Sequence, residues 1–401
     1  MVKNILIVLG LFFLLEFYVY KAVGVLLKSP QFRIIYISVT ALIYIVELYF
    51  IFSIGINKYD AHKMSYIISI VLIFLLPKVF IAFFLLIDDV FRLLDYGIQH
   101  LNRNEEKHYP HRRNFLSLLG LGLAGLFSGI IVDGIIFGKY RHRARLVKLK
   151  IKNLPKAFKG YTIVQISDVH SGSFSHPEKL RNAINLINEQ QADLVLFTGD
   201  MVNMVAEEFE PFVPLFSEIK AKDAKLAVLG NHDYGYYYYT TDKEQKANVA
   251  KLIELEEKAG FQMLRNEHTV IEKAGERLYI IGVENWGLPP FPQYGDLDKA
   301  TEGIPQNAAK ILMSHDPTHF DEVVKTHPSD IALTLSGHTH GMQFGLDLKN
   351  IKWSPVQYKY PKWIDLYESL GKYLYVNRGF GVLGFPGRVG VNPEITVFTL
   401  K

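Results

Sequence analysis

Leu-Ala-Val-Leu-Gly-Asn-His-Asp, residues 226–233, sets an apolar run directly before three side chains that can bind a metal or transfer a proton. Four further motifs of this kind follow apolar runs in the same part of the chain. They are Asp168-Val169-His170, Gly199-Asp200, Ser314-His315-Asp316 and Gly337-His338-Thr339-His340-Gly341. Carboxylate, amide and imidazole groups are ligands that Mn, Fe and Zn accept, and such ions promote phosphate ester hydrolysis. The motifs therefore predict a metal-dependent hydrolase.

Short apolar runs alternate with longer polar segments from Leu146 onward, which is the pattern of an α/β domain. The expected strands are residues 147–151, 161–166, 194–197, 225–229, 278–283, 310–313, 331–335, 373–376 and 395–400. The expected helices are residues 177–189, 211–221, 243–259 and 317–325. Each motif follows one of these strands, and open α/β sheets bind ligands at the carboxyl ends of their strands. We therefore expect the five motifs to meet in one crevice.

The composition limits the class of protein. The chain has 401 residues, enough for two domains or for one domain and a membrane section. Its apolar content of 49% and mean hydropathy of +0.11 indicate that part of it lies in lipid. A net charge of +4 is too small to argue for nucleic acid. Because the chain has no cysteine, disulfides and thiolate metal sites are excluded, while the compartment stays undecided.

Four apolar stretches occupy the first part of the chain, at about residues 4–27, 34–56, 65–88 and 115–138. Each is near the ~20 residues that a helix needs to cross a bilayer. We therefore expect a transmembrane region of about four helices over residues 1–140 and a catalytic domain over 145–401. Glu16, Glu47 and Lys78 interrupt the first three stretches. They are functional candidates, or they pair inside the bundle or lie near the ends of the spans.

The basic residues between the spans predict the orientation. They are Lys28 and Arg33 in the first loop, and Arg92, Arg103, Lys107, Arg112 and Arg113 in the third. The positive-inside rule places both loops in the cytoplasm, so the N-terminus and the catalytic domain lie outside. A basic group after the fourth span favours the opposite orientation. Its members are Arg141, His142, Arg143, Arg145, Lys148 and Lys150.

Arg112-Arg113-Asn114-Phe115-Leu116 resembles a bacterial twin-arginine export signal, although its internal position is unusual. The alternative is an ordinary basic flank on the cytoplasmic side. Either interpretation places Arg112 inside. We therefore expect a multi-pass protein of the cell (inner) membrane whose catalytic domain faces the periplasm or the exterior.

The order and spacing of the five motifs resemble those of the calcineurin-like metallophosphoesterases, over residues 147–401. Residues 376–381 and 392–395 are similar to the ending of the bacterial membrane-associated branch of that family. The resemblance implies an α/β four-layer sandwich of two mixed β-sheets flanked by helices. The branch includes phosphodiesterases with an export signal, and it lies close to enzymes that cleave the pyrophosphate of UDP-diacylglucosamine.

The resemblance also implies a role for each motif residue. Asp168, His170 and His340 correspond to ligands of one metal, Asn231, His315 and His338 to ligands of a second, and Asp200 to the bridging carboxylate. His232 corresponds to the histidine that contacts the phosphate and protonates the leaving oxygen, and Asp233 to the neighbour that orients it. The expected cofactors are two divalent ions, Mn first and Fe, Zn or others as alternatives. A hydroxide that bridges them attacks the phosphorus.

The resulting prediction is a membrane-anchored phosphoesterase that cleaves a phosphodiester or pyrophosphate bond of a lipid or cell-envelope substrate. The expected partners are the membrane and a phosphoester substrate, which is lipid-linked if the substrate is a lipid. No nucleic acid partner is expected. Two alternatives stay open. One is a nucleotide phosphohydrolase whose spans serve only as a tether, and the other is a catalytically idle metal-binding membrane receptor.

Aromatic rings and lysines interleave between Gly341 and Tyr373, and we call this stretch the aromatic segment. The rings are Trp353, Tyr358, Tyr360, Trp363 and Tyr367, and the lysines are Lys349, Lys352, Lys359 and Lys362. Rings mixed with lysines suit the headgroup region of a bilayer, where the segment would present a lipid phosphate to the metals. The equal alternative is that the rings pack on the edge of the domain.

Overall fold

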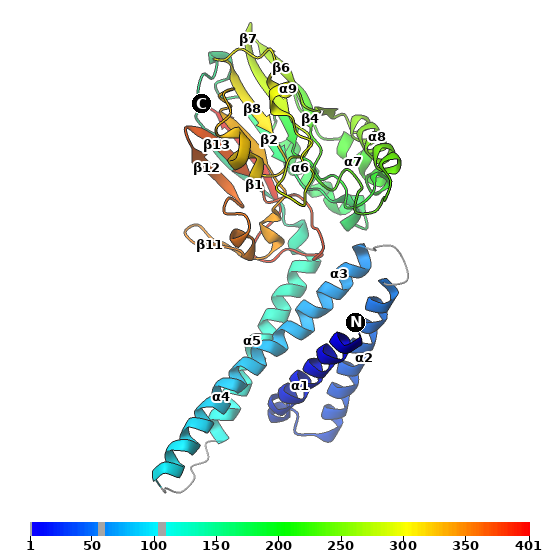
Figure 1. Cartoon of the computed structure of the whole chain (residues 1–401), viewed down its shortest axis with the longest axis vertical. Helices are drawn as coiled ribbons and strands as arrows, with labels where there is room; N and C mark the ends of the chain where they lie inside the picture. Colours follow the sequence, from blue (N-terminus) through cyan, green and yellow to red (C-terminus); the bar gives the residue numbers. More distant parts are fainter. Residues whose placement is uncertain (1, 55–60, 103–109) are drawn as a thin grey trace. The chain divides into compact units, whose positions relative to one another are not determined.

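The structure is a computed structural model that describes residues 2–54, 61–102 and 110–401. Tertiary contacts divide the chain into two units, Met1–Gly134 and Ile135–Lys401. Figure 1 shows a helical first unit and a second unit that is rich in strands.

The first unit consists of helices. They are α1 (Val2–Leu26), α2 (Pro30–Ile54), α3 (Ala61–Ile70), a π-helical turn (Val71–Leu75), α4 (Leu76–Asn102) and α5 (Pro110–Ile136). Three segments in the described residues are long and apolar enough to cross a bilayer, namely Pro30–Ser53, Lys63–His100 and His111–Tyr140. The expected span 4–27 coincides with α1 except for Leu27, and α1 is not among these segments, so a count of four spans stays a prediction. The end of the expected second span, residues 55–56, lies outside the described residues.

Polar groups pair across the helices of this unit. The Lys78 ammonium forms an ion pair with Glu16, so these two groups pair inside the bundle. Tyr44 and Tyr36 donate hydrogen bonds to the same carboxylate over 2.6 and 3.3 Å. Glu16 thus joins α1 to α2 and α4, and its charge is fully compensated.

The twin arginines also have partners in this unit. Arg112 Nε lies 2.8 Å from Asp88 Oδ1, and Arg113 pairs with Asp88 at 3.3 Å and with Asp89. Both arginines thereby tie α5 to α4, which gives them a structural role. Export through this motif stays a prediction. Arg103 and Lys107, which contributed to the orientation argument, lie outside the described residues.

The second unit contains two six-stranded mixed sheets and a small ribbon. The first sheet has the order β1 (Arg143–Leu149), β14 (Glu394–Leu400), β2 (Thr162–Ile166), β3 (Leu194–Phe197), β4 (Ala224–Ala227) and β5 (Gln262–Met263). The second has the order β12 (Asp365–Ser369), β13 (Lys372–Val376), β9 (Leu333–Ser336), β8 (Ala309–Met313), β7 (Glu276–Gly282) and β6 (Glu267–Lys273). The ribbon pairs β10 (Leu346–Asp347) with β11 (Lys352–Trp353). Strands β2 to β5 are parallel, as are β7, β8, β9 and β13.

Alternating apolar side chains stack these sheets face to face. Ile163 and Leu196 of the first sheet share one buried cluster with Ile280 and Ile311 of the second. The opposite face of the first sheet packs on α6 (Arg181–Glu189), α7 (Val213–Ser217) and α8 (Asp242–Lys258). The opposite face of the second sheet packs on α9 (Leu297–Thr301) and on a π-helical turn, Phe320–Val324. The predicted four-layer sandwich is thereby confirmed.

Local structure differs from the expectation in several respects. The first strand begins at Arg143, so the basic group after the last span belongs largely to the sandwich, where Arg145 pairs with Asp347. Because these basic residues form part of the folded domain, they are weaker evidence that the end of the fourth span lies in the cytoplasm. The expected helix 317–325 is mainly the π-helical turn, and the expected helix 211–221 is α-helical only over α7. Strands β5, β6, β10, β11 and β12 and helix α9 were not expected. Strand β6 escaped prediction because its sequence, Glu-His-Thr-Val-Ile-Glu-Lys, is mostly polar.

Candidate metal centre

The five motifs lie at the carboxyl ends of parallel strands from both sheets. Asp168, Asp200 and Asn231 follow β2, β3 and β4, while His315 and His338 follow β8 and β9. Hydrogen bonds join the two sets of loops. His315 Nδ1 donates to Thr198 O over 2.7 Å, and the His338 N–H donates to Asp168 Oδ1 over 2.9 Å. The two sheets therefore present their motif loops to one shared edge.

Asp168, His170 and His340 form the first donor cluster, and their ligand atoms all lie within 4.8 Å of one another. His170 Nε2 is 3.0 Å from His340 Nε2, which is 3.2 Å from Asp168 Oδ1. All three side chains are buried. These are the residues expected to hold one metal.

Asp200, His315 and His338 form the second donor cluster, again within 4.8 Å. Asn231 belongs beside it, because its Oδ1 is 2.8 Å from His338 Nδ1. Asp200 Oδ2 lies 3.1 Å from His315 Nε2 and 3.6 Å from His170 Nε2, so this carboxylate faces both clusters. The structure thus brings together every residue that the sequence proposed as a ligand.

Backbone carbonyls orient three of the imidazoles. Nδ1 of His170 and of His232 faces Val202 O at 3.2 Å and Asn203 O at 2.7 Å. A carbonyl can only accept, so each Nδ1 carries the hydrogen and each Nε2 presents a lone pair to the centre. His315 has the same arrangement at Nδ1, and its buried Nε2 lies 3.1 Å from Asp200 Oδ2. Buried imidazole nitrogens that converge on carboxylates are what a bound cation would satisfy, so the donor set fits a metal.

The ligand loops adopt an unusual backbone conformation. Five of the proposed ligands have positive φ angles: Asp168 54°, His170 47°, Asp200 61°, His338 69° and His340 51°. Such conformations cost about 1–3 kcal/mol each and concentrate at functional sites, where the surrounding structure enforces them. The sharp turns direct these side chains into the crevice.

Asp233 supplies part of that enforcement. Its carboxylate accepts hydrogen bonds from the N–H groups of Asp200, Met201 and Gly230, each over 2.8 Å. Burial and then the charge of Asp200 raise the pKa of Asp233 to about 7. The carbonyl of Asn203, rather than Asp233, contacts the ring of His232. Asp233 therefore organises the loops after β3 and β4, and its expected role toward His232 stays a prediction.

The electrostatics of the centre favour positive charge. Burial alone would raise the pKa of Asp200, but the His315 and His232 imidazoles outweigh it and hold the pKa well below its ordinary value. Burial lowers the pKa of His232, against the opposing charge of Asp200. In His315 the balance reverses, and Asp200 raises the pKa to about 10 despite burial. The lowered pKa of Asp200 keeps this carboxylate ionised, which is the form that binds a metal.

The sequence did not predict that several other residues lie next to the metal-binding side chains. Tyr360 is buried, and its hydroxyl lies 2.9 Å from His338 Nε2. The buried guanidinium of Arg388 donates to Gly381 O over 2.9 Å and lies 3.5 Å from His340 Nδ1. Tyrosine and arginine are common residue types, and only the tertiary fold identifies these two as neighbours of the donors.

The aromatic segment is only partly exposed. Trp363 and Tyr360 are 5% and 8% exposed and pack with Ile364 and Val391, so these rings pack on the domain edge. For Trp363 the alternative of a ring packed on the domain edge therefore holds, while a bilayer contact of the rest of the segment stays a prediction. Trp353 and Tyr358 remain at the surface, 38% and 80% exposed. Two of the lysines, Lys352 and Lys362, form ion pairs with Asp365 and Asp321.

Two family models match this sequence. Residues 161–342 match the one described as "Calcineurin-like phosphoesterase", and residues 3–139 match "Probable Calcineurin-like phosphoesterase, transmembrane domain".

Three relatives illustrate the similarity. The chain is 32% identical to "Uncharacterized metallophosphoesterase YkuE" of Bacillus subtilis, over 72% of this chain and 97% of that protein. It is 28% identical to "Transmembrane protein with metallophosphoesterase domain" of Danio rerio, over 64% of this chain and 56% of that protein. The match thus spans about half of the Danio rerio protein. It is also 28% identical to "Phosphodiesterase YaeI" of Escherichia coli, over 60% of this chain and 82% of that protein.

The contact between Tyr360 and His338 leads to a testable prediction. With Nδ1 of His338 as the ligand, Nε2 carries the hydrogen and donates it to the Tyr360 oxygen, which fixes the ring. Tyr360→Phe removes that acceptor, and we expect the affinity for Mn²⁺ to fall about tenfold or more. Calorimetric titration of the metal-free full chain measures this affinity. Tyr358→Phe, which alters an 80% exposed ring, serves as the control. Equal affinities in all three proteins would contradict the prediction.

Proposed function

Because the chain belongs to the calcineurin-like metallophosphoesterase family, we propose that it hydrolyses a phosphodiester or pyrophosphate bond of a lipid or cell-envelope substrate. The family match over residues 3–139 makes it a membrane-associated member. The observation that carries the proposal is the convergence of two buried donor clusters on Asp200. A receptor with an idle metal domain would have no need of the complete donor set.

The residues divide the chemistry among them. Asp168, His170 and His340 would hold one divalent ion, and Asn231, His315 and His338 a second, with Asp200 between them. Two such ions, Mn²⁺ in our proposal, would offset the charge of the phosphate and activate a water as nucleophile. His232 presents Nε2 to the site while Asn203 O holds its Nδ1–H. We assign to this Nε2 the contact with the phosphoryl group and the transfer of a proton to the leaving oxygen.

A lipid-borne substrate is supported by the surface of the aromatic segment. Trp353 and Tyr358 remain exposed, and Lys359 lies over the rings of Phe291 and Tyr360, 5.3 Å from each centroid. Phe291 in turn packs edge-on against His338 of the second cluster, at 4.8 Å between centroids. Lys359 and the rings of Phe291 and Tyr360 thus connect the surface of the domain to the donor residue His338. We propose that this surface contacts headgroups and delivers a lipid phosphate to the centre.

The proposed location is the inner membrane, with the catalytic unit outside the cytoplasm. The basic first loop supports this orientation through the positive-inside rule. The incorporation of Arg143 and Arg145 into β1 removes much of the opposing signal. The substrate would then be a lipid or glycolipid of the outward-facing leaflet.

Asp200→Asn tests the catalytic assignment. Losing the shared carboxylate should lower Mn²⁺-dependent hydrolysis of bis-p-nitrophenyl phosphate by more than about 100-fold, the upper end of the loss for residues that only support a ligand. The number of Mn²⁺ ions bound per chain should fall with it. Asp298→Asn, at a side chain that is 93% exposed, should leave both quantities unchanged. A fully active Asp200→Asn protein would refute the site.

The lipid proposal is tested with two substrates that share one leaving group. Replacing both Trp353 and Tyr358 by Ala should lower kcat/KM for hexadecyl p-nitrophenyl phosphate in vesicles about tenfold, a change of about 1.4 kcal/mol. Hydrolysis of water-soluble bis-p-nitrophenyl phosphate should be unaffected. Leu370→Ala, at another exposed apolar side chain, is the control. Equal losses on both substrates would rule out a headgroup contact.

The orientation is testable because the chain has no cysteine of its own. A single cysteine at the exposed position Asp298 should react with a membrane-impermeant maleimide in intact cells. A single cysteine at Lys28, in the first loop, should react only after the cells are permeabilised. The reverse pattern would place the catalytic unit in the cytoplasm.

A further inference from the structure

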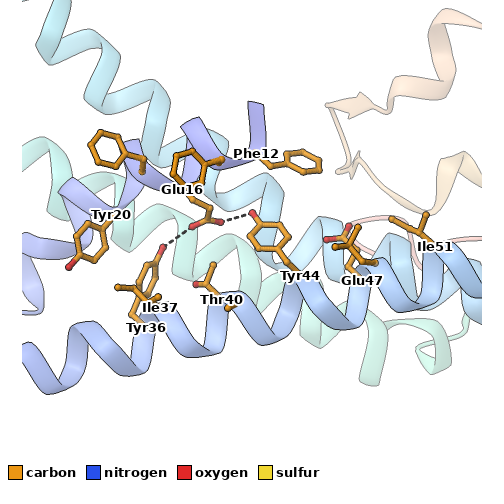
Figure 2. A pocket seen from close by; sticks show the side chains of 13 residues that line it. Phe12, Glu16, Tyr20, Tyr36, Ile37, Thr40, Tyr44, Glu47 and Ile51 are labelled. Atoms are coloured by element: carbon orange, nitrogen blue, oxygen red, sulfur yellow. Dashed lines mark hydrogen bonds between the residues drawn. The ribbon is translucent and has the colours of Figure 1, made fainter. Parts of the chain in front are cut away.

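The helical first unit, which we call the membrane unit, contains a groove between α1 and α2 (Figure 2). Its volume is about 490 Å³, within the range of about 300–1,000 Å³ typical of small-molecule sites. The walls are almost entirely apolar or aromatic, and they include Phe13, Phe17 and Ile51, which are 71%, 58% and 47% exposed. Since these helices belong to the transmembrane region, an occupant would enter from the bilayer.

One side of the groove carries a polar stripe along α2. Tyr36, Thr40, Tyr44 and Glu47 recur at helical spacing, and Figure 2 shows Glu16 of α1 facing Tyr36 and Tyr44 across the groove. Glu16 is bonded to both tyrosines and to Lys78. This part of the stripe is therefore satisfied by the protein itself.

Glu47 is the exception within the described residues. It lines the groove and is only 6% exposed, yet its carboxylate makes no hydrogen bond or ion pair. Lys78 forms its ion pair with Glu16, and its single positive charge cannot offset both Glu16 and Glu47, so the groove keeps one net negative charge. A carboxylate inside a membrane is costly unless a partner offsets its charge, and such groups mark functional sites. The groove therefore lacks one cationic hydrogen-bond donor.

We propose that the groove binds an ethanolamine phospholipid of the surrounding bilayer, with its ammonium group on Glu47 and an acyl chain along the apolar walls. The ammonium supplies both the missing charge and N–H donors. A choline headgroup carries the same charge but has no N–H to donate, and an anionic headgroup would be repelled by Glu47.

Glu47 lies in the C-terminal half of α2. It precedes Ile54, the last residue of this 25-residue helix, by seven residues, or about 10 Å at 1.5 Å per residue, and it follows the midpoint, Leu42, by five residues. The ammonium would therefore reach about 10 Å along α2 from the end of the helix, while the acyl chain follows the groove toward Tyr36.

Lipid retention by the full-length chain tests this inference. The purified protein, exchanged into an equal mixture of dioleoyl phosphatidylethanolamine, phosphatidylcholine and phosphatidylglycerol, is analysed by native mass spectrometry. We expect one ethanolamine lipid per chain, retained about tenfold over the other two. Glu47→Gln should abolish that preference, because the ammonium loses its charged acceptor.

Two further variants complete the experiment. Glu189→Gln makes the same charge change at an exposed side chain outside the groove and should behave as the unchanged protein. Ala41→Phe fills the groove from an exposed position while keeping Glu47, and it should displace the lipid without disturbing packed residues. Equal retention of the three lipids, an intact preference in Glu47→Gln, or an intact complex in Ala41→Phe would each overturn the proposal.

Discussion

The buried carboxylate of Asp200 is the group on which the catalytic unit depends. It faces His170 of one donor cluster and His315 of the other, and its Oδ1 accepts the backbone N–H of His232 over 2.8 Å. One side chain therefore relates the two clusters and the loop that follows β4. Because a buried charge is tolerated only when other groups compensate it, these loops must close around Asp200 in one arrangement. The strained backbone and the hydrogen bonds of Asp233 are what that closure requires.

The sequence predicted the position of the metal-binding residue types where each of them follows an apolar run of strand length. Asp168, Asn231 and His338 each follow an apolar run, so their common position at the carboxyl edge of the sheets could be predicted from spacing alone. The four-layer architecture followed from the family resemblance and not from periodicity. Strand β6 was missed because its pairing with β7, rather than its own polar sequence, makes it a strand.

Other features depend on contacts between distant residues. Tyr360 and Tyr358 are similar in sequence context, yet one lies beside His338 and the other is 80% exposed. Trp363 packs in a cluster with Val391, which is 28 residues further along the chain. The carbonyl of Asn203 orients His232 through its backbone, which no side-chain motif reports. In the membrane unit, hydropathy located the apolar stretches, but only the structure distinguished the paired Glu16 from the unpaired Glu47.

The position of β14 has a consequence for biosynthesis. This strand, residues 394–400, lies between β1 and β2, which are formed by residues 143–149 and 162–166. The ribosome therefore makes the two neighbours long before the strand that joins them, and each exposes an open edge until then. The first sheet closes only after translation has reached residue 400, so the domain matures as a late, post-translational event. A chaperone or a translocation machine that acts on this chain would meet it with that gap still unfilled.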